Sequence, residues 1–177
     1  FIGNVCPTAA DAPIIPTTDG REVACESTGA NNLFIWKNTT EQHLGEVTFF
    51  KVQSGVLHVG DDLQNARTGH VERFGQLFVA EGKKKHHVEH LHAGDLGLTV
   101  KLKDGRTNDT YHPKGAELAF EPIRFPASRT QTAIRAASKN DEEKMGEALH
   151  ALAHNDPTLI AGYRGDIKQT LLHAQGE

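Results

Sequence analysis

Short runs of alternating hydrophobic and polar residues, separated by turn residues, fill the chain from about residue 30 to residue 122. The longest run, residues 44–53, carries apolar side chains on both faces, as expected for a strand in a closed or doubly covered sheet. No helical period appears here, so the pattern predicts an antiparallel β-barrel over residues 30–122. We expect strands at residues 33–39, 44–53, 56–59, 62–66, 70–79, 86–91, 96–102 and 117–120, the last of which closes the barrel.

Two of these strands carry more specific expectations. Residues 96–102 alternate most regularly, with leucine or valine at every second position, which predicts a strand buried on one side only. Gly75 interrupts residues 70–79, and a glycine at such a position indicates a bulge or a tight bend at a barrel corner.

A proline-bounded connector at residues 122–126 separates the barrel from a different pattern. Apolar residues then recur at helical spacing over residues 141–154, with Asn140 as the expected N-cap and acidic residues in the first turn. Strands are expected around this helix at residues 129–137, 159–163 and 167–173. The order predicts a truncated ferredoxin-like β-α-β-β unit over residues 127–177.

The last strand of this unit, residues 167–173, is expected to lie at an open edge. A complete split β-α-β fold would continue into a second helix and a fourth strand. An uncovered sheet edge recruits other chains by strand addition. We therefore expect crystal or solution contacts along residues 167–173.

Composition narrows the class of protein further. A formal net charge of −4 argues against a strongly basic nucleic-acid binder but leaves room for a local basic patch. No apolar run approaches the ~20 residues of a membrane helix, so no membrane contact is expected. Cys6 and Cys25 lack C-x-x-C spacing, which favours reduced thiols in a cytoplasmic protein. The chain opens on Phe1 without a targeting segment, which suggests that an upstream portion is missing, and residues 1–29 read as a linker.

Four histidines lie between residues 86 and 92. In a continuous strand His86, His90 and His92 would share one face, so a three-histidine zinc site is conceivable. The alternative is a solvated edge strand on which imidazoles replace the usual charged residues. We expect the solvated strand and no metal, and we keep a metal-binding β-barrel enzyme as the rival function.

Charged residues elsewhere fit turns better than catalysis. Lys83, Lys84 and Lys85 form an expected loop with three consecutive ammonium groups, which is either a solvated tip or a phosphate contact. Asp61 and Asp95 follow turn residues, as Asp109 also does, where a carboxylate accepts backbone N–H bonds of its own turn. No nucleophile–base pair or phosphate-binding loop stands out, so this chain is not expected to be an enzyme.

Seven motifs, in their order and spacing, resemble elongation factor G from about residue 31 to the C-terminus. They are L-G-E-V-T-F-F-K-V-Q-S-G-V-L-H-V-G-D-D-L (44–63), H-V-E-R-F-G-Q-L (70–77), H-A-G-D-L-G (92–97), L-K-D-G-R-T-N-D-T (102–110), E-P-I-R-F-P (121–126), D-E-E-K-M-G-E-A-L (141–149) and N-D-P-T-L (155–159). The resemblance covers the second domain of that family, a barrel, and the start of its ferredoxin-like third domain. Asn108 stands where the family usually has Gly, Lys51 where it usually has Arg, and residues 174–177 match the third domain's Gly-x-Gly-Glu motif only in part.

The resemblance implies ribosome-binding domains of a translational GTPase that acts in translocation during protein synthesis. It implies small-subunit ribosomal RNA as a partner, together with a missing GTP-binding domain that would hold GTP and Mg²⁺ and whose end residues 1–29 would include. No cofactor is expected in this chain. The departures leave a divergent paralogue, a ribosomal-protection protein and a release-factor GTPase as alternatives. The candidate RNA contacts are Arg67, Arg73, Lys83, Lys84, Lys85, Lys103 and Arg106.

Overall fold

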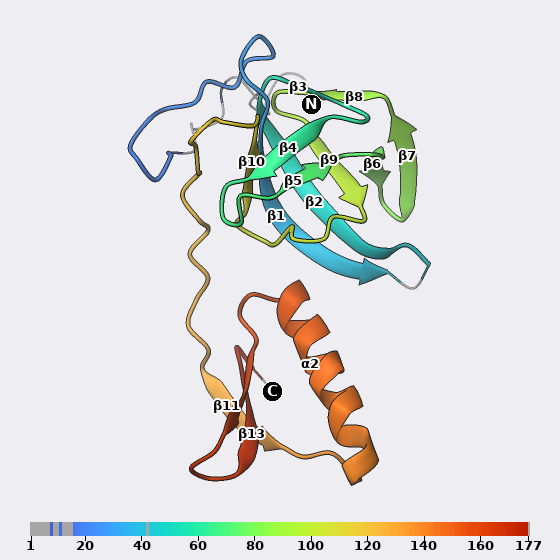
Figure 1. Cartoon of the computed structure of the whole chain (residues 1–177), viewed down its shortest axis with the longest axis vertical. Coiled ribbons are helices and arrows are strands. Elements are labelled where there is room, and N and C mark those ends of the chain that lie inside the picture. The colour runs from blue at the N-terminus through green and yellow to red at the C-terminus, as the bar shows by residue number, and fades with distance from the viewer. Residues whose placement is uncertain (1–7, 9–10, 12–15, 42, 177) are drawn as a thin grey trace. The chain divides into compact units, whose positions relative to one another are not determined.

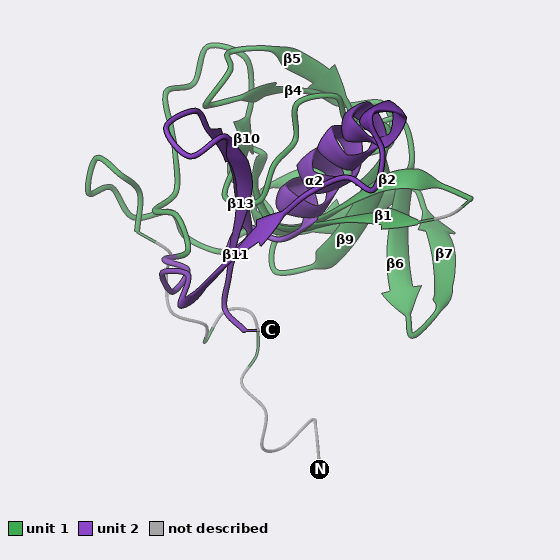
Figure 2. Ribbon diagram, turned by 90° about the horizontal axis from the view of Figure 1, so that it is seen from below, with its two compact units in different colours: residues 1–123 green, residues 124–177 purple. Residues whose placement is uncertain are grey.

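The computed structural model describes residues 8, 11, 16–41 and 43–176 and divides into two compact units, residues 1–123 and 124–177 (Figure 2). Cys6 and most of the first half of the expected N-terminal linker lie outside the described residues. Cys25 is a half-buried free thiol. In the described part of the chain, no helix has the length and apolar character needed to cross a membrane.

Unit 1 is an antiparallel barrel-like sheet (Figure 1). Its eight strands are β1 (Asn32–Glu41), β2 (Gly45–Ser54), β4 (Asp62–Asn65), β5 (Val71–Arg73), β6 (Leu77–Glu81), β7 (Lys84–Val88), β9 (Leu96–Val100) and β10 (Thr110–His112). They lie in the order β5-β4-β10-β1-β2-β9-β6-β7, and β3 (Val56–His58) pairs with β8 (His90–His92) as a separate ribbon. The predicted antiparallel barrel is confirmed, with Gly75 in the break between β5 and β6.

Closure of the barrel differs from the prediction in two ways. Residues 117–120 form no strand, and Phe120 makes only an isolated bridge to Thr17. The strand between β1 and β4 is instead β10, which pairs with both. It places Tyr111 fully inside the barrel, and Pro113, which cannot donate a ladder hydrogen bond, follows its last residue. The hydrogen-bonded ladder also stays open, since β5 and β7 each pair with one strand only among the described residues. The interior of the barrel is therefore filled by packed side chains, although its strands do not form a closed hydrogen-bonded ladder.

Two apolar clusters lie on opposite faces of β2, as its two-sided pattern predicts. The larger one, the barrel core, consists of Leu33, Ile35, Phe50, Val52, Leu57, Leu63, Phe74, Leu77, Leu91, Leu102 and Tyr111. The smaller one, the second cluster, consists of Val47, Phe78, Leu98 and Val100, with Phe49 packed against it. The prediction of a one-sided strand at residues 96–102 was wrong. Gly97 and Thr99 are buried along with Leu98, so both faces of β9 are covered there. Leu96, at the start of the strand, is 58% exposed.

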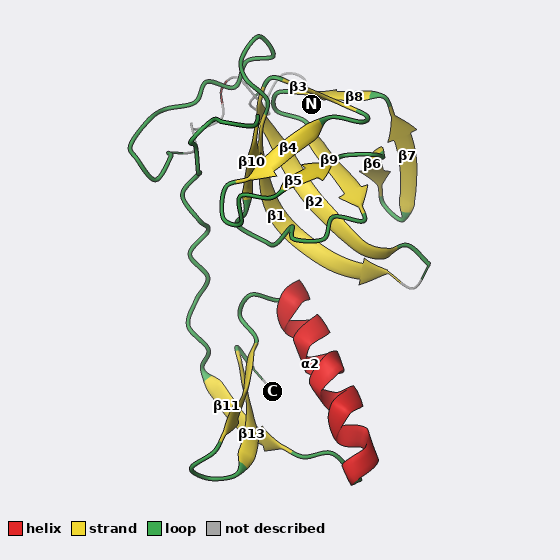
Figure 3. Cartoon of the chain, viewed as in Figure 1, coloured by secondary structure: helices red, strands yellow, loops and turns green. Residues whose placement is uncertain are grey.

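Unit 2 confirms the predicted β-α-β-β order. Its elements are β11 (Thr130–Ile134), a 3-10 turn η2 (Lys139–Asp141), α2 (Glu142–Asn155), β12 (Ile160–Arg164) and β13 (Gln169–Ala174). The three strands form one sheet, and α2 lies beside it (Figure 3). The helix N-cap is Asp141 rather than Asn140, because η2 occupies the residues just before it. The Ser138 hydroxyl donates to the Asp141 carboxylate at 2.7 Å and so supports this turn.

The expected open edge at residues 167–173 is wrong. The strand order is β11-β13-β12, so β13 pairs on both sides and is the central strand. The crossover through α2 leaves a one-strand gap between β11 and β12, and β13 fills that gap. Leu171 on β13 is accordingly buried. The two edges of this sheet are β11 and β12.

Candidate nucleic-acid interface

The loop between β9 and β10 is organised by one buried carboxylate. Asp109 accepts the Arg106 backbone N–H at 3.0 Å and the Asn65 side-chain amide at 2.8 Å. Arg67 donates to both carboxylate oxygens, from Nε at 2.7 Å and from Nη2 at 2.8 Å. This fork raises the pKa of the Arg67 guanidinium. The turn-capping role predicted for Asp109 is confirmed, but no feature of the local sequence indicated that the same group anchors Arg67.

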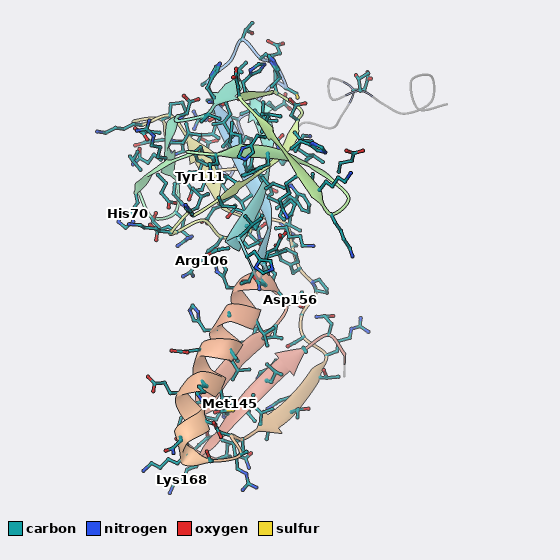
Figure 4. All side chains as sticks on the ribbon, turned by 90° about the vertical axis from the view of Figure 1, so that its right-hand side faces the viewer. His70, Arg106, Tyr111, Met145, Asp156 and Lys168 are labelled. Atoms are coloured by element: carbon teal, nitrogen blue, oxygen red, sulfur yellow. The ribbon has the colours of Figure 1, made fainter. Side chains whose placement is uncertain are left out.

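A second attachment ties this loop to the barrel core. The Tyr111 phenol donates to Glu72, and burial, with that hydrogen bond, raises the pKa of Tyr111 well above its ordinary value. The other oxygen of Glu72 accepts the Lys103 backbone N–H at 2.5 Å. Figure 4 shows His70 and Arg106 on the outside of unit 1 and Tyr111 among its strands. The side chains of Lys103 and Arg106 are exposed, and the backbone N–H groups of both residues are held by Glu72 and Asp109.

The three consecutive lysines do not form one loop. Gly82, with a φ of +59°, and Lys83 make the turn between β6 and β7, while Lys84 and Lys85 already belong to β7. Lys85 pairs with Glu41 at 2.5 Å and its side chain is only 17% exposed. Lys83 and Lys84 are exposed. The hairpin tip thus presents two ammonium groups, and the third bridges β7 to β1.

The structure gives a reason for Asn108 at a position where the family usually has Gly. Its φ of +79° is a conformation that favours Gly and that Asn tolerates better than most residues. The side-chain amide donates to the Ile123 carbonyl at 3.1 Å and accepts the Ile123 N–H at 2.8 Å. Asn108 therefore holds the backbone at the end of unit 1, which a Gly could not do.

The histidines do not gather as the zinc hypothesis required. His86 lies on β7 and contacts Glu81 at 2.9 Å, whereas His90 and His92 lie on β8 in the other sheet. A break at Glu89 ends β7, so residues 86–92 are not one strand. Among the described residues no three His, Cys, Asp or Glu side chains are placed to hold a metal ion. The single strand face that the zinc hypothesis required of His86, His90 and His92 is therefore not formed.

The remaining sequence-predicted residues have clear positions. Asp61 accepts the His58 N–H and Asp95 accepts the His92 N–H, each at 2.8 Å, so both cap turns as predicted. Arg73 is exposed on β5 with its guanidinium beside Gly60. Arg67 is held by Asp109 and by the Asp104 carbonyl at 2.8 Å. The exposed candidate cations whose side chains form no ion pair within the described part are Arg73, Lys83, Lys84, Lys103 and Arg106.

Comparison with known proteins agrees with this architecture. Residues 31–112 match the family model of elongation factor G domain 2, and residues 125–177 match that of elongation factor G domain III. A crystal structure of a protein from Thermus thermophilus is similar with a TM-score of 0.72 at 26% sequence identity. That match covers 84% of this chain and 23% of the Thermus chain, so the chain spans about a quarter of the length of that protein.

A translation-factor-type barrel followed by a β-α-β-β unit is the architecture of a translation elongation factor. The two family matches account for most of the chain and occur in the order expected of a single protein. The chain belongs to the elongation factor G family.

Proposed function

We propose that this chain docks an elongation factor G-type translation factor on the small ribosomal subunit. The barrel would anchor the factor, and unit 2 would pass on rearrangements during translocation. The observation that carries the proposal is the ordered match to the second and third domains of the family. Ribosomal RNA fits the barrel chemically because the exposed unpaired cations lie on a hairpin tip, in a loop and, for Arg73, at the end of β5, where they reach phosphates without reading bases.

Five side chains are the proposed phosphate contacts: Arg73, Lys83, Lys84, Lys103 and Arg106. Lys85 and Arg67 are left out, because Glu41 and Asp109 already neutralise them. Breaking either ion pair to reach RNA would expose a carboxylate next to phosphate, which opposes binding.

GTP binding and hydrolysis belong, in this proposal, to a domain outside these 177 residues. That domain would hold GTP and Mg²⁺ and would be a partner of unit 1, and this chain would contribute no catalytic residue. The whole protein would act in the cytoplasm. A ribosomal-protection or release-factor-type GTPase would dock in the same way, and a translocation assay on the whole protein separates these from a translocase.

Lysines at the hairpin tip provide the first test. Changing Lys83 and Lys84 to Gln should lower the log–log slope of small-subunit affinity against salt by up to about 2, roughly one counterion per phosphate contact. Binding of the labelled chain to purified small subunits, measured at several salt concentrations, gives this slope. The matched control changes the exposed Lys114 and Lys144 to Gln and should leave it unchanged. An identical slope in both variants contradicts the proposed contacts, and no subunit binding by the wild-type chain contradicts the docking role.

A further inference from the structure

Trp36 sits at an irregularity of the longest hairpin. In the β1–β2 register Ile35 faces Phe50 and Lys37 faces Phe49, so Trp36 is the extra residue of a β-bulge. A bulge sets two residues opposite one and redirects their side chains. The Trp36 ring accordingly packs on Phe49, with ring centroids 5.4 Å apart at an interplanar angle of 55°. Simple alternation would have placed Trp36 on the opposite face from Lys37.

An apolar row continues from Phe49 across the sheet. Phe49 pairs with Leu98, Leu98 with Phe78, and Phe78 with His87, which places all four on one face. The His87 ring lies 4.2 Å from that of Phe78. Leu98 and Phe78 are buried, whereas His87 is exposed, Phe49 is half-buried and Trp36 is 36% exposed. We name the rings of Trp36, Phe49, Phe78 and His87 the aromatic face.

Cations border the aromatic face. Lys37 lies opposite Phe49, and Lys51 lies two residues along the same side of β2, opposite the exposed Leu96. Neither ammonium has a carboxylate partner within the described residues. Glu41, four residues along β1 from Lys37, is already neutralised by Lys85. The face therefore combines accessible rings with net positive charge.

We propose that the aromatic face binds an unpaired strand of RNA. Bases would stack on Trp36 and on the accessible edges of Phe49 and His87, while Lys37 and Lys51 would contact the phosphates. A protein partner fits less well, because lysine is depleted at protein–protein interfaces relative to the rest of the protein surface. The choice of RNA over DNA rests on the proposed function. The residues of this surface differ from the hairpin tip and loop cations of the proposed docking contacts.

The single tryptophan makes stacking directly observable. Titrating the 177-residue chain with a short single-stranded oligoadenylate should quench the Trp36 emission in a saturable way, because a stacked base quenches indole. Duplex RNA of the same length should not quench it, since its bases are unavailable. A DNA oligomer of the same sequence tests the choice of sugar. Absence of oligomer binding by the wild-type chain would overturn the proposal and assign the face to a protein contact.

Substitutions separate stacking from general attraction. Trp36→Ala should weaken binding of labelled oligoadenylate by roughly 5- to 150-fold, the effect of losing one stacked base, while Trp36→Phe should retain most of it. Lys51→Gln should lower the salt slope by about 0.7. Lys114→Gln is the charge-matched control and should change nothing. Unaltered affinity of Trp36→Ala, with circular dichroism like that of the wild type, overturns the proposal.

The two docking surfaces fail independently. The Lys83 and Lys84 variant tests subunit docking and leaves the aromatic face intact. A chain that binds small subunits but no oligomer contradicts only the aromatic face. A chain that binds oligomers with Trp36 quenching but no small subunits contradicts only the proposed docking.

Discussion

Replacing Asp109 by Ala is expected to lower the free energy of unfolding of unit 1 by about 3–4 kcal/mol. The Asp109 carboxylate is buried and accepts four hydrogen bonds, two of them from the Arg67 guanidinium. Its removal leaves the Asn65 amide and the Arg106 N–H without their acceptor, each of which costs about 1–3 kcal/mol when buried. Arg67 loses less, because its side chain is 43% exposed and regains water.

Urea unfolding, monitored by the fluorescence emission of Trp36, measures this change in unit 1 alone, since Trp36 is the only tryptophan and lies in unit 1. The matched control is Asp104→Ala in the same loop. Asp104 pairs with the exposed His70, and such a surface pair contributes about 0–1 kcal/mol. Equal losses for both variants would show that Asp109 is only another surface carboxylate.

Replacing Gly55 by Ala is expected to cost about 3–5 kcal/mol of unit 1 stability, from a disfavoured backbone conformation together with overpacking. Gly55 has a φ of +79°, and an added Cβ would lie 2.8 Å from the Asn31 Cα and 2.9 Å from the Ala30 carbonyl carbon. These are backbone atoms and cannot rotate away. The Ser54–Gly55 turn also brings β3 alongside β8, so the strain falls on the barrel core.

Gly45→Ala separates the two contributions. Gly45 has a φ of +73° but no atom within 4 Å of an added Cβ, so it should lose only the conformational cost of about 1–2 kcal/mol. The same urea experiment compares both variants. A loss at Gly55 no larger than that at Gly45 would contradict the close approach of residues 30 and 31.

Alternation and turn residues predicted the architecture because most strands bury the apolar side chains of their own sequence pattern. Both faces of residues 44–53 were predicted to be apolar, and each packs on a cluster. The same reasoning failed where burial of a strand depends on neighbours that are distant in the sequence. Leu96 is exposed while Gly97 is buried against Leu91 and Phe50, and alternation carries no information on which neighbours cover a strand. The edge assigned to residues 167–173 failed because strand order depends on the crossover, which the sequence does not encode locally.

The candidate site was predictable only as a set of charges. Sequence identified Arg67, Lys83, Lys84 and Lys85 as candidate contacts, but their partners in the folded chain decide which can reach RNA. Glu41 lies 44 residues from Lys85, and Asp109 lies 42 residues from Arg67. Both contacts depend on the folded sheet. The aromatic face was missed for a similar reason, since the bulge at Trp36 appears only in the register of β1 against β2.

Hydrogen exchange of the chain, with and without purified small ribosomal subunits, tests the docking proposal most directly. Binding through the proposed cations should slow amide exchange at residues 82–84 and 101–106, because RNA would cover the hairpin tip and the loop. Exchange at residues 160–164, on the edge of the other sheet, serves as the internal reference. Slower exchange at both barrel segments, with unchanged exchange at residues 160–164, is the result that the account predicts. Unchanged exchange at both segments, with subunits in excess, would contradict it.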